Sequence, residues 1–97
     1  ASISAGLDYP GVSPIHCFLK DTKRARYTSA TDEAALNAYK LVTKLEKINP
    51  SLEPSHAFAE AIKIAPKLSK ETIIIVNSCG DAKKDRDILK ERLGKIN

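Results

Sequence analysis

The chain has 97 residues, of which 42% are hydrophobic and 29% are charged, and its formal net charge is +4. This length suits one small domain with a thin core, and the composition is ordinary for a globular protein, so disordered and fibrous classes are excluded. Basic residues alternate with acidic ones and gather only at Lys20, Lys23, Arg24 and Arg26, which favours a solvated surface over a nucleic-acid site.

Signatures of membrane insertion and of metal binding are also missing from the sequence. No apolar run approaches the roughly 20 residues that a membrane span requires, and the first residues lack the basic-then-apolar order of a secretory signal. We therefore expect a cytoplasmic or organelle-matrix protein without membrane contacts. Cys17 and Cys79 have neither zinc-ligand nor Cys-x-x-Cys spacing, so both are expected to be free thiols.

The first third of the chain predicts a loop, a short helical turn, a strand and the start of a long helix. Residues 1–14 are rich in Gly, Ser and Pro and predict an ordered loop, followed by a helical turn at 15–20 and a strand at 25–30. Thr31 is a hydroxyl N-cap ahead of two carboxylates, so a helix should begin there and end at Asn49-Pro50. Its expected apolar face comprises Ala35, Ala38, Tyr39, Val42 and Leu45.

The second half predicts a helix, a strong strand and a last helix. Pro54 is suited to a first helical turn and Pro66 ends the same helix, whose expected apolar stripe is Phe58, Ala61, Ile62 and Ala65. Residues 72–77, with the sequence Thr-Ile-Ile-Ile-Val-Asn, are apolar on both faces, which is typical of a central parallel strand. From Lys83 the chain is charged, with apolar residues at helical spacing.

The predicted order is loop, strand, helix, helix, strand, helix. This alternation indicates an α/β protein in which the chain forms part of a parallel three-layer sheet, with helices on both faces. Two strands cannot complete such a sheet. The missing strands are expected to come from an earlier part of the same natural chain or from oligomerisation.

The run Ser2-Ile3-Ser4-Ala5-Gly6-Leu7-Asp8-Tyr9-Pro10-Gly11-Val12 closely resembles a signature of tryptophan synthase β subunits. The resemblance continues through residues 29–34, 52–53, 55–57 and 76–77, and it covers nearly the whole chain. It implies that residues 1–97 are the C-terminal portion of the large, cofactor-binding domain of a fold type II pyridoxal-phosphate enzyme, incomplete by itself.

The family resemblance also implies an activity and its partners. Members of that family replace the hydroxyl of L-serine with indole on pyridoxal phosphate, giving L-tryptophan. The expected partners are therefore the remainder of the β chain, a second β chain, a tryptophan synthase α subunit, and the substrates serine and indole. The family's cofactor lysine and glycine-rich phosphate cradle lie upstream of the matched region, so the chain alone is expected to be inactive.

Four positions match family residues with roles in catalysis or cofactor binding. Asp8 matches an aspartate that engages the amino-acid substrate when a mobile subdomain closes, and Glu53 matches a glutamate on the cofactor-ring side of the active site. Cys79 matches a serine that faces the pyridine nitrogen, and Gly80 follows it in the same cofactor loop. From the residues alone, Asp8 could instead brace a turn, Glu53 could serve only the start of a helix, and Cys79 could be a small buried thiol.

The same resemblance implies a monovalent-cation site. The backbone carbonyls of Leu7, Tyr9 and Gly11 match ligands of Na+ or K+ in the family, and alternate carbonyls of a loop can converge on a hard cation. A plain loop is the alternative, because a backbone ligand requires no particular side chain.

Two short stretches depart from the family pattern and leave other functions open. The changes are Asn49, Ser51 and Pro54 near Glu53, and the stretch 79–82, which lacks the family's Arg and second Gly. A divergent β subunit is one interpretation. A non-enzymatic α/β module that binds an anion or a partner at the turn 79–81 is another, and nucleic-acid binding is a third.

Overall fold

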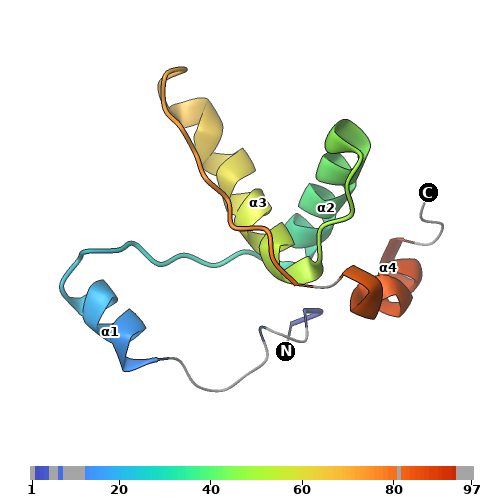
Figure 1. Cartoon of the computed structure of the whole chain (residues 1–97), viewed down its shortest axis with the longest axis horizontal. Helices are drawn as coiled ribbons and strands as arrows, with labels where there is room; N and C mark the ends of the chain where they lie inside the picture. Colours follow the sequence, from blue (N-terminus) through green and yellow to red (C-terminus); the bar gives the residue numbers. More distant parts are fainter. Residues whose placement is uncertain (1, 5–6, 8–12, 81, 94–97) are drawn as a thin grey trace.

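The structure is a computed structural model, and it describes residues 2–4, 7, 13–80 and 82–93. These residues form four α-helices and two short 3-10 helices: α1 (Pro14–Asp21), α2 (Asp32–Glu46), α3 (Leu52–Ile64), η2 (Ala65–Lys67), η3 (Ala82–Asp85) and α4 (Arg86–Leu93). In Figure 1, α2 and α3 diverge like the arms of a V from a common base beside α4, while α1 stands apart at the end of an extended connection.

The predicted parallel three-layer sheet is wrong, because the described part of the chain contains helices and no β-strand. Both stretches predicted as strands, 25–30 and 72–77, lack regular secondary structure. A strand is held by hydrogen bonds to a neighbouring strand, and neither stretch has such a neighbour among the described residues. The side chains of Ile73 and Ile75 are accordingly 85% and 90% exposed instead of buried.

Helix α2 begins where the sequence predicts it. The hydroxyl of Thr31 accepts a hydrogen bond from the backbone N–H of Ala34 at 3.1 Å, which satisfies one of the free donors of the first turn. The helix ends before Asn49-Pro50, at Lys47, whose backbone is left-handed with φ 59° and donates to the carbonyl of Thr43. Four of the five predicted apolar positions are buried, but Leu45 is 62% exposed.

Helix α3 begins two residues before Pro54. The residues of its first turn are more buried than the apolar stripe that the sequence predicts. Leu52, Pro54 and Ser55 are buried, whereas Ile62 is 43% exposed. The reason is the divergence of α2 and α3, which leaves their far ends without a covering layer (Figure 1). After a turn at residues 69–72, the chain returns through an extended segment, 73–79, toward the start of α3.

The core lies at the base of the V. It comprises Ile3, Leu36, Tyr39, Leu52 and Leu89, with Ile88 and Leu93 packed against it. Each large apolar side chain buried there contributes roughly 1.5–3 kcal/mol, and Leu52 is completely buried. The Cα radius of gyration is 14.5 Å, larger than the ~12–13 Å of a compact domain of this length, so the core occupies only part of the molecule.

None of the described helices combines the length and the apolar character needed to cross a membrane.

Candidate functional site

The first turn of α3 is capped by a buried carboxylate from another part of the chain. Ser51 occupies the N-cap position, but its side chain makes no capping hydrogen bond. The backbone N–H of Leu52 instead donates to Oδ2 of Asp85 at 2.8 Å, and Asp85 is only 2% exposed. Because the N-terminus of a helix presents free N–H groups and a partial positive charge, a carboxylate is stabilised there. Asp85 thus fixes η3 against α3.

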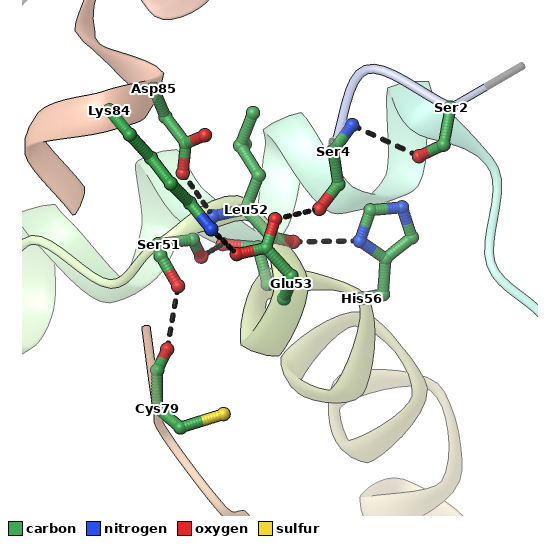
Figure 2. Close-up of polar contacts among 10 residues, drawn as sticks. Ser2, Ser4, Ser51, Leu52, Glu53, His56, Cys79, Lys84 and Asp85 are labelled. Carbon is green, nitrogen blue, oxygen red and sulfur yellow. Dashed lines mark hydrogen bonds and ion pairs between the residues drawn. The ribbon is translucent and has the colours of Figure 1, made fainter. Parts of the chain in front are cut away.

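The hydroxyl of Ser51 holds a second segment. It donates to the carbonyl of Cys79 at 2.6 Å, while the carbonyl of Ser51 accepts from the hydroxyl of Ser55 at 2.8 Å. Figure 2 shows the contact between Ser51 and Cys79 at the point where the extended segment reaches the base of α3. Ser51 therefore anchors the end of a segment that is otherwise exposed.

Gly80 makes this close approach sterically feasible. Its φ is +90°, a conformation that side-chain-bearing residues rarely adopt. A Cβ at this position would lie 2.6 Å from Oγ of Ser51 and 3.3 Å from Oε1 of Glu53. The turn between the extended segment and η3 thus needs a glycine for both its dihedral angle and its contact with α3.

Glu53 receives hydrogen-bond donors from both ends of the chain. Its Oε2 accepts from the hydroxyl of Ser4, and its Oε1 accepts from the ammonium of Lys84 (Figure 2). The Glu53 side chain is 17% exposed and that of Lys84 is 42% exposed, so this ion pair lies at the edge of the protein surface. The carboxylate is therefore held by two directional contacts beside the turn of Gly80.

The N-terminal residues 2–4 are fixed at this site by further contacts. The backbone N–H of Ile3 donates to Oδ1 of Asp32 at 3.4 Å, and Ser4, which is fully buried, has its N–H bonded to the hydroxyl of Ser2 at 3.0 Å. His56 lies nearby with its Nδ1–H donating to the carbonyl of Leu52 at 2.7 Å and its Nε2 4.0 Å from Asp32. These contacts join the start of the chain to the first turns of α2 and α3.

Three of the residues predicted for the site come together here. Glu53 and Gly80 are in direct proximity, and Cys79 is linked to the same turn of α3 with its thiol exposed. Leu7 is 49% exposed, and its backbone N–H donates to the carbonyl of Ser4 at 3.0 Å. Asp8, Tyr9 and Gly11 lie outside the described residues, so the predicted gating aspartate and cation ligands stay predictions.

Sequence reasoning gave no structural role to Ser4, Ser51, Lys84 and Asp85. Ser51 precedes the helix start, a usual N-cap signal, yet its bond to Cys79 depends on tertiary contact. Lys84 and Asp85 belong to a charged stretch that is typical of a solvated helix. Only the fold shows that Asp85 points into the core and that Lys84 reaches Glu53.

A separate apolar groove contains none of the predicted site residues. It lies between α2 and α3, has a volume of about 270 Å³, and is lined by Ala34, Asn37, Ala38, Leu41, Ala59, Ile62 and Lys63. The chemically functional groups thus gather at the base of the V, not in the groove between its arms.

Comparison with known proteins shows which sequences this chain resembles. No family model matches the chain. It is, however, 59% identical over 92 residues to the tryptophan synthase beta chain of Fusobacterium nucleatum, a match that covers 95% of this chain. Over almost its whole length, this chain is similar to part of the tryptophan synthase beta chain. The beta chains of Cereibacter sphaeroides and Bordetella petrii are 55% and 53% identical over 93 residues, or 96% of this chain.

The chain spans only 23% of the length of these three tryptophan synthase beta chains. This coverage fits the fragment that the sequence predicts, and the identity of 53–59% to the three beta chains confirms the resemblance inferred from the Ser2–Val12 run.

Proposed function

We propose that this chain forms part of a pyridoxal-phosphate-dependent tryptophan synthase beta chain, which replaces the hydroxyl of L-serine with indole to give L-tryptophan and water. The observation in its favour is the 59% identity over 92 residues, together with the proximity of Glu53, Cys79 and Gly80. The finer expectations belong to the same proposal: a cytoplasmic location, a β homodimer, a partner α subunit, gating by Asp8, and a Na+ or K+ site at the carbonyls of Leu7, Tyr9 and Gly11.

The residues at the base of α3 fit the ring side of pyridoxal phosphate. A Cβ at Gly80 would fill the space beside Ser51 and Glu53, so the glycine keeps the backbone of 79–80 close to the carboxylate. The exposed thiol of Cys79 can act as a weak hydrogen-bond donor to a ring nitrogen. When bound, the cofactor supplies the electron sink that labilises the hydroxyl of serine.

The described residues offer this cofactor one wall of a site and no phosphate cradle. The start of α3 would favour an anion such as a phosphate. The backbone N–H of Leu52 at this position, however, already donates to the carboxylate of Asp85. We therefore expect the phosphate group and the reactive lysine to be held by the remainder of the beta chain. The 97-residue chain is expected to form no tryptophan by itself.

A chimeric beta chain tests the proposal. This chain would replace the matching segment of the Fusobacterium nucleatum beta chain, and tryptophan formation from serine and indole would be measured with pyridoxal phosphate present. We expect the chimera to form tryptophan and the host chain without any segment to form none. Reinsertion of the host's own segment is the matched control. A folded chimera that binds pyridoxal phosphate yet forms no tryptophan would contradict the proposal.

A further inference from the structure

The carboxylate of Glu53 is engaged at both of its oxygens by groups from opposite ends of the sequence. Ser4, 49 residues earlier, donates its hydroxyl to Oε2, and Lys84, 31 residues later, donates its ammonium to Oε1. Figure 2 shows the two donors approaching the carboxylate from different sides. Two directional contacts on one side chain restrict both the rotation of the carboxylate and its position.

The two donors act by different physical means. Ser4 is completely buried, so its hydroxyl is fixed by packing and gives the carboxylate a rigid neighbour. Lys84 is partly exposed and brings a positive charge, which attracts the Glu53 carboxylate, as does the position of Glu53 in the first turn of α3. Ser4 therefore restricts the direction of the carboxylate, and Lys84 holds it by charge attraction.

We propose that Ser4 and Lys84 are positioning residues that hold the Glu53 carboxylate in the orientation it needs beside the cofactor. This inference rests on the proposed function, in which Glu53 lies on the cofactor-ring side. Neither residue touches the cofactor in this scheme, and both act through Glu53. Ser4 also links Glu53 to residues 2–4, so the placement of these residues and that of the carboxylate are coupled.

The test uses the chimera with Ser4→Ala, Lys84→Met and Lys84→Arg, each alone and combined with Glu53→Gln. We expect Ser4→Ala and Lys84→Met to lower kcat by ~10- to 100-fold, with a smaller change in the KM for indole, because a misplaced group slows the chemical step. Lys84→Arg keeps the charge and should restore most of kcat. Ser78→Ala and Lys90→Met, both at exposed positions, are the matched controls and should leave kcat unchanged.

The combined variants decide whether the two residues act through Glu53. In the Glu53→Gln background, Ser4→Ala and Lys84→Met should each lower kcat by no more than about twofold further, since residues that act as one unit are non-additive. Fully multiplicative losses, or Lys84→Arg as impaired as Lys84→Met, would overturn the inference.

A second measurement keeps the inference separate from the proposed function. If the unmodified chimera forms no tryptophan, the proposed function fails, and the contacts are then tested in the 97-residue chain. The decrease in melting temperature caused by Glu53→Gln together with Lys84→Met should be smaller than the sum of the two single decreases, and the same holds for Glu53→Gln with Ser4→Ala. Additive decreases would show that neither residue holds Glu53.

Discussion

At the scale of single residues, Gly80 occupies a position in the candidate site that leaves no room for a side chain. Residues with a side chain rarely adopt the φ of +90° observed at Gly80. An added Cβ would also lie only 2.6 Å from Oγ of Ser51, which is too close. We expect Gly80→Ala to lower the free energy of unfolding by about 1–3 kcal/mol, from backbone strain and the displaced Ser51 hydroxyl. Urea unfolding measures this, with Ser78→Ala at an exposed position as the control. An unchanged unfolding midpoint would contradict the described turn.

Asp85 is the other residue on which the site depends. Its buried carboxylate accepts the N–H of Leu52, so Asp85→Ala leaves that donor without its partner inside the protein. We expect a loss of about 1–3 kcal/mol in the free energy of unfolding. Asp87→Ala, two residues later and exposed, is the matched control and should change it by less than about 0.5 kcal/mol. Equal effects of the two substitutions would show that Asp85 is not the cap.

At the scale of elements, local signals in the sequence predicted the helices well. The hydroxyl and carboxylates at residues 31–33 set the start of α2, and Pro54 lies in the first turn of α3 as expected. These signals are local, because capping and first-turn preferences involve residues only a few positions apart. The burial of Leu45 and Ile62 was predicted wrongly, since a periodic apolar stripe does not specify whether another element covers it.

The two predicted strands were wrong for a different reason. The pattern at residues 72–77 correctly indicates an apolar, β-branched segment, but a strand exists only when another strand supplies its hydrogen bonds. The described residues supply none, so the segment stays extended and exposed. β-propensity reflects how well a side chain packs against neighbouring strands, and the sequence of the segment alone does not show whether such strands are present.

Hydrogen exchange tests directly whether residues 72–77 are unpaired in this chain. In the 97-residue chain, the backbone amides of residues 73–79 should exchange at rates near those of an unfolded peptide, because they lack partners in a β-ladder. The amides in the middle of α2 should be protected by comparison, and they serve as the internal reference. Strong protection at residues 73–76 would mean that the segment is paired after all.

At the scale of the whole molecule, the candidate site is assembled from distant stretches of the described chain: residues 2–4, the start of α3, and residues 79–80 with 84–85. The family resemblance predicted Glu53, Cys79 and Gly80 one by one, and the fold brings Cys79 and Gly80 against the start of α3, whose first turn carries Glu53. It could not predict Asp85 as the helix cap or Lys84 as the partner of Glu53. Those contacts depend on how the last helical segment packs, which no local pattern specifies.

The thin core and the exposed segments are consistent with a chain that spans 23% of the length of its relatives. Under the proposed function, the remainder of the beta chain supplies the phosphate cradle and the reactive lysine, and this chain supplies the wall that contains Glu53 and Cys79.

The most direct test of that arrangement compares the two cysteines. Both Cys17 and Cys79 are free and exposed in this chain, so an alkylating reagent should modify each of them, as peptide mass spectrometry would show. In the chimera, we predict that adding pyridoxal phosphate slows the modification of Cys79 and leaves that of Cys17, on α1, unchanged. Equal rates at Cys79 with and without the bound cofactor would contradict the placement of this site against the cofactor.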